Sequence, residues 1–148
     1  EVVLTLQGSD YKYTDYQVRG TTQVVFKIKG TVGAQVGLFE EALSDLNGVT
    51  INEFTLGANS ARRILFRNRH LSSTILAGSA WNYNGYYNDT VFTTFWISWK
   101  HNIMSVGQGP QVGQQVLLAY NNSESPVEIN YLGFASYSTY VHTFRFYN

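Results

Sequence analysis

Hydrophobic and polar residues alternate along much of the chain, as they do in β-strands that bury one face. Within residues 22–29 the apolar side chains of Val24, Phe26 and Ile28 share one face, and the more apolar segment Val91–His101 alternates in the same way. Further strands are predicted at Val2–Leu6, Ala34–Phe39, Val49–Leu56, Arg62–Phe66, Ser73–Leu76, Ile103–Val106, Gln114–Tyr120, Val127–Leu132 and Val141–Tyr147. This pattern predicts an all-β fold, a single-domain antiparallel β-sandwich of about ten short strands.

The most apolar strand also predicts which tryptophan is buried. Alternation over residues 95–99 sends Phe95, Ile97 and Trp99 to one face and Trp96 to the other. We therefore expect Trp99 in the core, and Trp96 on the outer face of the sheet or under a neighbouring chain.

Length and charge narrow the class of protein. The 148 residues are the usual size of one domain, so residues 1–148 are expected to form a single unit without disulfides, since Cys is absent. A net charge of +0 with 14% charged residues argues against a nucleic-acid partner. No apolar run approaches the ~20 residues of a membrane span. The chain begins at Glu1 without an initiator Met, which indicates a processed mature chain or a trimmed one, and we expect a secreted protein.

Catalytic motifs are not apparent. His70, His101 and His142 have no ligand partners at metal-site spacing, and there is no Gly-x-Ser-x-Gly elbow. The Gly107-x-Gly109 pair is followed by Pro110 and a predicted strand, which is not the context of a phosphate-binding loop. We expect a binding protein and not an enzyme.

The segment Trp81–Asp89 (WNYNGYYND) is the strongest candidate for a binding surface. A sugar has an apolar C–H face and a rim of hydroxyl groups, so its site needs an aromatic ring and side chains that donate and accept hydrogen bonds. This segment supplies both. A tyrosine-rich structural loop, or a contact between subunits, remains the alternative interpretation.

Strand alternation predicts which loops meet. If consecutive strands reverse direction, the loops Ala77–Thr90, Gly107–Gly113 and Gly133–Tyr140 lie at one end of the sandwich, and His101 and Glu124 lie at the other. The sugar-binding residues predicted from this grouping are Trp81, Tyr83, Asn84, Tyr86, Asn88, Asp89, Gln111, Tyr137 and Tyr140.

Two polar clusters could also serve other roles. Asp89 with Asn84 and Asn88 offers oxygen ligands for Ca²⁺, as does Glu124 with Asn121 and Asn122, although no recognised calcium loop is present. Asn88-Asp89-Thr90 and Asn121-Asn122-Ser123 both fit the N-glycosylation sequon, and a glycan on Asn88 would block the predicted site.

Several segments, in order, resemble one known family, that of the farnesoic acid O-methyltransferase-like domains. They are Val25–Lys29, Glu53–Ser60, Phe95-Trp96-Ile97-Ser98-Trp99, Ile103–Gly109, Tyr131–Ser136 and Phe144-Arg145-Phe146, so the resemblance covers about residues 20–148. It implies a β-sandwich of the kind found in extracellular modules and similar to certain galactose-binding lectins of marine invertebrates. A methyltransferase would normally need an α/β sheet with a glycine-rich turn, which this pattern does not predict.

From the residues and the resemblance together we expect a secreted lectin for a terminal sugar, of the galactose or β-galactoside class, acting as a homodimer without membrane insertion. A protein-binding adhesion or structural module is the alternative. A terpenoid-acid-binding or methyltransferase-like protein is a third possibility.

Overall fold

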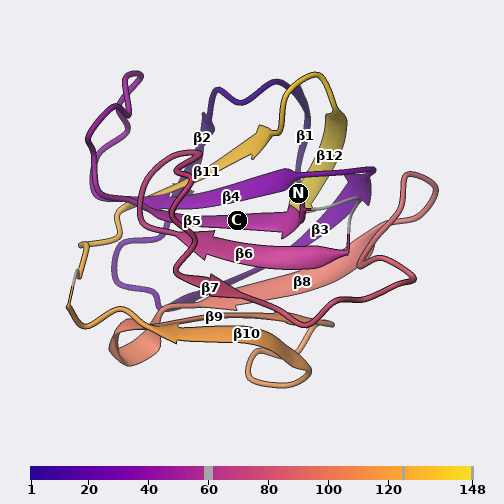
Figure 1. Cartoon of the computed structure of the whole chain (residues 1–148). Coiled ribbons are helices and arrows are strands. Elements are labelled where there is room, and N and C mark those ends of the chain that lie inside the picture. Colours follow the sequence, from indigo (N-terminus) through magenta and orange to yellow (C-terminus); the bar gives the residue numbers. More distant parts are fainter. Residues whose placement is uncertain (59–61, 125, 148) are drawn as a thin grey trace.

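The computed structural model describes residues 1–58, 62–124 and 126–147, with the backbone alone for residues 16 and 17. Within these ranges, twelve strands form two six-stranded antiparallel sheets that pack face to face (Figure 1). Sheet A has the order β1 (Val2–Gln7), β12 (Val141–Phe146), β3 (Gln23–Gly30), β8 (Thr93–Ser98), β9 (Ile103–Gln108) and β10 (Val116–Asn121). Sheet B has the order β2 (Lys12–Gln17), β11 (Tyr131–Ser136), β4 (Ala34–Phe39), β5 (Asn52–Gly57), β6 (Arg63–Arg67) and β7 (Ala77–Gly78). The predicted all-β sandwich is confirmed.

The core lies between the sheets and is rich in aromatic rings. On β3 the side chains of Val24, Phe26 and Ile28 are at most 4% exposed, as their alternation predicts. Phe134 of sheet B stacks on Phe144 of sheet A with ring centroids 4.5 Å apart. Such contacts hold the two layers together, because each buried ring removes a large apolar area from water.

Trp96 of β8 lies on the outer face of the sheet, as predicted, but Trp99 is not fully buried in the core as expected. Phe95 and Ile97 face the core as predicted, and Trp99 is only partly buried against it. Trp96 lies on the outer face, yet it is 1% exposed. Its ring lies against Gly107, where an added Cβ would collide with the indole, and its Nε1–H donates to the Gln114 carbonyl at 2.9 Å. The loop before β10 therefore buries Trp96 on the outside of the sheet, without a second chain.

Three strand predictions were wrong. β2 was not predicted, and the strand expected at Ser73–Leu76 occurs instead as the two-residue β7. The strand expected at Val127–Leu132 is β11, which runs on through a stretch predicted as loop. Gly133 misled the prediction, since it stands inside this strand, where an added Cβ would meet Phe39 Cε2 at 3.0 Å. A close approach, not a turn, explains this glycine.

The helical content is small. The one 3₁₀ turn in the described ranges, Lys100–Asn102, joins β8 to β9. No helix in this part of the chain is long and apolar enough to cross a bilayer.

Candidate functional site

Strand directions bring the predicted loops to one end of the sandwich. β12 begins beside Gly30, β8 begins beside Ile28, and β11 ends beside Ala34. The connections through residues 79–92, 109–115 and 137–140 therefore all lie at the end of the molecule where β3 turns into β4. The turn containing His101 lies at the opposite end, as predicted.

The nine predicted residues nevertheless occupy several separate places. Trp81 and Tyr83 form an exposed aromatic pair, 42% and 78% exposed, with ring centroids 6.2 Å apart. Asn84 lies in the same turn, where its N–H donates to the Asn82 side chain at 3.1 Å. Gln111 lines a different hollow of ≈ 190 Å³, formed by residues 108–115 alone.

Two residues of the predicted loop have structural roles. Tyr86 is only 7% exposed, and its hydroxyl donates to the Ala80 carbonyl at 2.8 Å, so its ring belongs to the core and not to a sugar-binding surface. The Asn88 side-chain oxygen accepts hydrogen bonds from the N–H and hydroxyl of Thr90 and from the N–H of Val91. Asn88 thereby shapes the turn that leads into β8, while Asp89 beside it is exposed.

The second predicted oxygen cluster is split by the fold. Asn122 is 4% exposed and donates from its side chain to the Asn52 side-chain oxygen at 2.9 Å. Asn121 and Glu124 are exposed. Asn122 is thus directed into the protein, away from the surface on which a shared calcium ion was expected.

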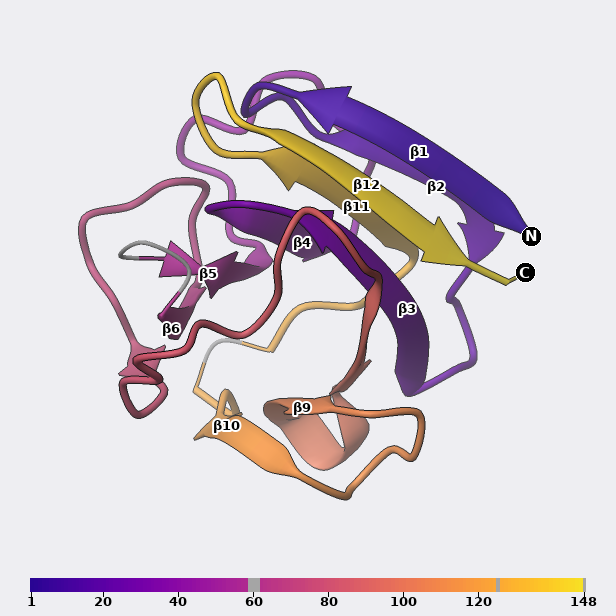
Figure 2. The same ribbon diagram turned by 90° about the vertical axis from the view of Figure 1, so that its right-hand side faces the viewer.

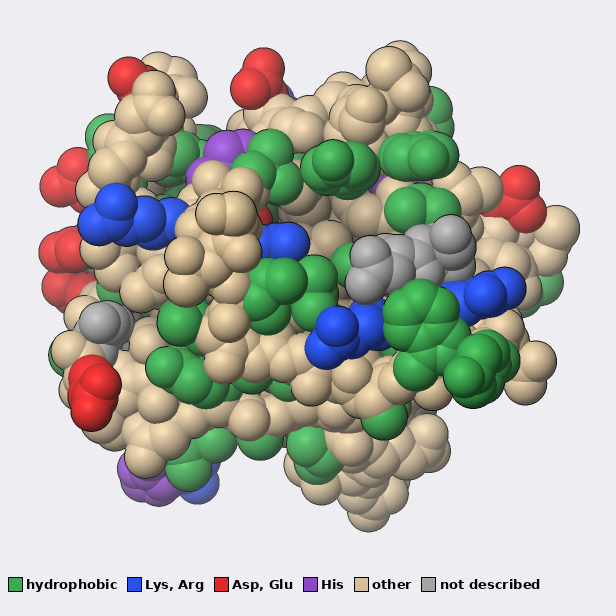
Figure 3. Space-filling view, viewed as in Figure 1, with side chains coloured by type: hydrophobic (Ala, Val, Ile, Leu, Met, Phe, Trp, Pro, Cys, Tyr) green, Lys and Arg blue, Asp and Glu red, His purple; other side chains and the backbone are tan. Residues whose placement is uncertain are grey.

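The outer face of sheet B carries a hollow of ≈ 270 Å³ that the sequence did not predict. Its wall is largely apolar, its floor contains polar side chains from three neighbouring strands, and Tyr137 stands at its rim, 48% exposed. The lining residues are Val32, Gly33, Gln35, Thr55, Ala58, Leu65, Arg67, Leu71, Ile75 and Tyr137. Figure 3 shows this face, with hydrophobic side chains over its middle and a second group at one margin beside basic side chains.

Gln35 in the floor is a buried amide without a partner. It lies on β4, is 0% exposed, and neither its Nε2 nor its Oε1 atom makes a hydrogen bond in the described structure. Leaving a buried polar group unpaired costs about 1–3 kcal/mol. An unpaired amide in the lining of a hollow is an available donor and acceptor for a ligand.

Arg67 on β6 borders the same floor. Its Nη1 donates to the Thr55 hydroxyl and its Nε donates to the Ser72 carbonyl, both at 2.8 Å. These two bonds fix the position of the guanidinium between β5 and residue 72. Among the described residues, Arg67 makes no ion pair within 4.0 Å.

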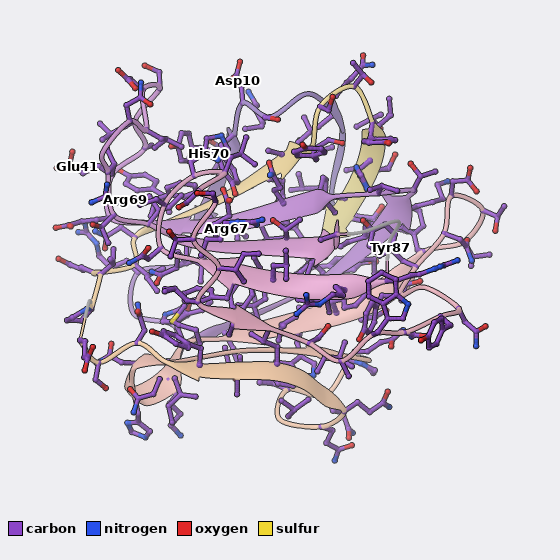
Figure 4. All side chains as sticks on the ribbon, viewed as in Figure 1. Asp10, Glu41, Arg67, Arg69, His70 and Tyr87 are labelled. Atoms are coloured by element: carbon purple, nitrogen blue, oxygen red, sulfur yellow. The ribbon has the colours of Figure 1, made fainter. Side chains whose placement is uncertain are left out.

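Residues 68–76, which we call the strap, cross the outer face of sheet B and cover part of the hollow. The Glu53 carboxylate of β5 anchors them, accepting from the Leu71 N–H at 2.9 Å and lying 2.7 Å from His70 Nδ1. It also accepts from the Tyr11 hydroxyl at 2.8 Å. Burial, and then the charge of Glu53, raise the pKa of Tyr11 well above its usual range. Figure 4 shows His70 and Arg67 on this side of the molecule.

The strap also borders a second, polar hollow of ≈ 400 Å³, lined by Asp10, Tyr11, Leu43, Ser44, Asp45, Leu46, Asn47 and His70. No cluster of three or more His, Asp or Glu side chains that could hold a metal ion occurs in the described ranges. The Asp45 carboxylate accepts from the Asn47 N–H at 3.0 Å and so orders its own loop.

Ser136, His142 and Tyr87 form a buried network at the same end of the core. The Ser136 hydroxyl donates to the Tyr140 carbonyl at 2.6 Å and lies 2.5 Å from His142 Nδ1, while the Tyr87 hydroxyl lies 3.1 Å from His142 Nε2. Burial lowers the pKa of His142 to about 4, so its ring is neutral near pH 7. Ser136 and His142 are both 0% exposed, which places this pair out of reach of a substrate.

The sequence contains a pattern from which a covered outer face of sheet B could have been predicted. Gln35 on β4, and Glu53 and Thr55 on β5, are polar residues that each precede an apolar core residue in these buried strands. Such residues lie on the face away from the core, and their burial there shows that something covers that face. The strap covers this face. Its path cannot be predicted from the alternation of residues along the strands.

Comparison with known proteins places the chain in a family. A sequence model for the family described as farnesoic acid O-methyl transferase matches residues 7–148. No curated protein matches the chain. Among solved structures it is similar to a glycoside hydrolase family 16 endo-glucanase from Bacteroides ovatus, in complex with G4G3G-2F-DNP. The two are 11% identical with a TM-score of 0.52, over 96% of this chain and 77% of that chain.

It is also similar to a native glycosidic hydrolase, at 10% identity and a TM-score of 0.52, over 98% of this chain and 76% of that one. At such identities the likeness is one of fold. The family match is of a different kind, because it is a match of sequence, and it includes the segments whose resemblance was noted above. The chain therefore belongs to the farnesoic acid O-methyl transferase family.

Proposed function

We propose that this protein binds carbohydrate without catalysing a reaction, and that the hollow on the outer face of sheet B takes a terminal sugar. The observation that carries the proposal is the unpaired amide of Gln35 in a largely apolar hollow with Tyr137 at its rim. A sugar ring matches these features, because its C–H face packs on an aromatic ring while its hydroxyls both donate and accept.

Entry of the ring requires a small local movement. The Gln35 amide is fully buried, and the strap residues Leu71 and Ile75 line the same hollow. Both are partly exposed, at 39% and 46%, and can swing outward without disturbing the core. A ring hydroxyl then reaches the amide, and the cost of the unpaired group is recovered on binding.

A non-enzymatic role is supported by what lines the hollow. Glycoside hydrolysis generally needs two carboxyl groups on either side of the scissile bond. The described lining contains no carboxylate, and nearby Glu53 is engaged by Tyr11, His70 and the strap. Methyl transfer from a nucleotide-derived donor normally uses an α/β sheet, whereas both sheets here are antiparallel and joined by loops.

The finer parts of the proposal come from the sequence. We propose the galactose or β-galactoside class for the sugar, a secreted location and a homodimeric state, following the resemblance to lectins of marine invertebrates. A second candidate is a protein-binding adhesion module, favoured by the exposed Trp81–Tyr83 pair, which lies outside the hollow.

The variant Gln35→Met tests the site, since it removes the amide while keeping a side chain of similar length. We expect the wild-type protein to bind at least one terminal monosaccharide with millimolar to micromolar affinity, about 4–8 kcal/mol. The variant should lose at least ~10-fold in affinity while its free energy of unfolding rises by up to about 1–3 kcal/mol, because an unpaired buried group has been removed.

Calorimetry with a panel of monosaccharides and chemical denaturation measure the two quantities. Gln111→Met, at an exposed residue outside the hollow, is the matched control and should change neither. An absence of binding heat with every sugar at millimolar concentration would contradict the proposal, as would a Gln35→Met variant that binds sugar normally.

A further inference from the structure

The four edge strands of the two sheets are not equally protected against pairing with a strand of another molecule. An edge strand presents unpaired N–H and C=O groups, and proteins usually guard it with a bulge, a lysine, a proline or a short length. The edge strand β10 has a register shift between Val116 and Leu118. β2 has a register shift opposite Tyr131–Gly133 and begins with Lys12, and β7 has only two residues.

β1 has none of these features. Its six residues, Val-Val-Leu-Thr-Leu-Gln, pair one for one with β12, from Val2 opposite Phe146 to Gln7 opposite Val141. Its other edge faces no strand in the described structure, and Figure 2 shows β1 along the outer margin of the molecule. On the outer face of this strand Val3 is 53% exposed. An edge without a bulge, a lysine or a proline is suited to pairing with another strand.

We propose that β1 is the interface of a homodimer in which it pairs, antiparallel, with β1 of a second copy. Sheet A of each copy then continues into sheet A of the other, across a two-fold axis perpendicular to the sheet. Such an isologous contact closes on itself, as in most homodimers.

Side-chain alternation selects the register. Val2, Leu4 and Leu6 pack against the core, so the same row must continue across the axis for the two cores to lie on one side of the joined sheet. Pairing centred on Leu4 sets Leu4 opposite Leu4 and Val3 opposite Thr5 of the second copy, and uses every residue from Val2 to Leu6. Pairing centred on Thr5 would bring Val2 opposite Gly8, which has left the extended conformation at φ 94°.

The neighbouring edge of sheet B supplies complementary charge. β2 lies beneath β1, where Val2 and Leu4 share a hollow with Lys12 and Asp15, two exposed residues of opposite charge. A two-fold axis through this edge brings Lys12 of one copy toward Asp15 of the other. This complementary charge on one edge argues for a second copy of this chain as the partner.

The two-fold axis also sets the direction in which the two sugar sites face; this part of the proposal rests on the proposed function. An axis perpendicular to sheet A leaves sheet B of both copies on the same side of the dimer. The two hollows therefore face one surface, and the dimer is suited to holding two glycans on the same surface.

A pair of double variants tests the interface and its register together. V3E/T5E places a carboxylate at position 3 opposite a carboxylate at position 5 of the second copy, twice by symmetry. V3E/T5K keeps the first carboxylate and sets an ammonium group opposite it. In both variants the new carboxylate at position 3 faces Arg145 of β12 in the same way, so the two differ mainly across the interface. V116E, on the exposed edge of β10, is the control for a different edge.

Sedimentation equilibrium without sugar should give twice 16.7 kDa for the wild type, V3E/T5K and V116E at micromolar concentration. V3E/T5E should sediment as a monomer that still unfolds in one cooperative transition, at a melting temperature that no longer depends on protein concentration. A monomeric wild type would overturn the proposal, and so would a V3E/T5E dimer or a dimer broken by V116E alone. Calorimetric titration of monomeric V3E/T5E with sugar tests the hollow separately, so failure of one proposal is distinguishable from failure of the other.

Discussion

At the scale of single residues, the fold assigns different roles to side chains that look alike in the sequence. Tyr86 and Tyr87 are core residues at 7% exposure, whereas Tyr83, three positions earlier, is 78% exposed. Trp96 is covered on an outer face while Trp81 projects from a loop. Residue type alone therefore did not separate binding residues from packing residues, because burial depends on what lies above each side chain.

Tyr137 and Trp81 offer a direct comparison of the two candidate surfaces. Both are exposed aromatic residues in loops at the same end of the sandwich, but only Tyr137 borders the hollow. We expect Tyr137→Ala to weaken sugar binding by about 1–3 kcal/mol, the usual contribution of a stacking ring. Trp81→Ala should leave the affinity within about twofold. Sugar titration and thermal melting of both variants check this. If Trp81→Ala weakened binding and Tyr137→Ala did not, the sugar site would lie in the loop at Trp81–Asp89.

His142 predicts a dependence of stability on acid. Its pKa is lowered from 6.5 to about 4 in the folded protein, so between these pH values the unfolded chain binds a proton that the folded chain does not. The His142 contribution is fully retained above pH 6.5 and is lost as the pH falls toward 4, by up to about 1.4 kcal/mol per pH unit.

Urea denaturation at intervals between pH 7 and pH 4 measures this effect. Carboxylates titrate in part of the same range, so the comparison is with His142→Gln, which cannot take up the proton. The variant should be less stable at pH 7 and show a shallower loss on acidification. Parallel curves for the two proteins would show that His142 is not the group responsible.

At the scale of elements, the strap makes the outer face of sheet B into a site. Without residues 68–76 the side chains of Gln35, Thr55 and Glu53 would lie on an open sheet face. The strap buries them and is held in turn by the Glu53 carboxylate, with Leu71 in an unusual conformation at φ 51°. A strained residue that persists in this way depends on the bonds around it.

Glu53→Ala should therefore loosen the strap before it affects the rest of the fold. Loss of the carboxylate leaves the Leu71 N–H and the Tyr11 hydroxyl without their partner, at a cost of about 1–3 kcal/mol each at most. Hydrogen exchange should show faster exchange at the Leu71 amide, while amides of β3 and β8 at the centre of sheet A keep their protection. Uniform acceleration over both sheets would mean that Glu53 supports the whole fold and not the strap in particular.

At the scale of the whole molecule, the two sheets have different proposed roles, one in sugar binding and the other in dimer formation. Sheet B presents the hollow and the strap, and sheet A carries the free β1 edge through which two copies are proposed to pair. Binding and assembly thus use different layers of one sandwich. A change in either can be made without touching the other, which makes the two proposals independently testable.

The dimer with both hollows on one side predicts avidity on a surface. On a dense layer of the sugar that calorimetry identifies, the wild type should dissociate on the order of 10²-fold more slowly than monomeric V3E/T5E. On a sparse layer, where two sites cannot engage together, the two proteins should dissociate alike. Surface plasmon resonance at both densities makes the measurement, and equal rates on the dense layer would contradict hollows that face the same way.

The sequence by itself determined the fold class and the end of the molecule at which the loops gather. Alternation is a local property: Val24, Phe26 and Ile28 share a face because consecutive side chains of a strand point to opposite sides. Reversal of consecutive strands likewise follows from short connections, and it correctly grouped residues 79–92, 109–115 and 137–140.

Only the tertiary structure decided what covers each outer face. The loop before β10 buries Trp96, the strap buries Gln35 and Glu53, and Asn122 turns inward to Asn52. Each of these contacts joins segments at least 17 residues apart in the chain, as Glu53 and His70 are. No local period encodes such contacts, because they depend on the path of loops over a surface that exists only once the sheets have formed.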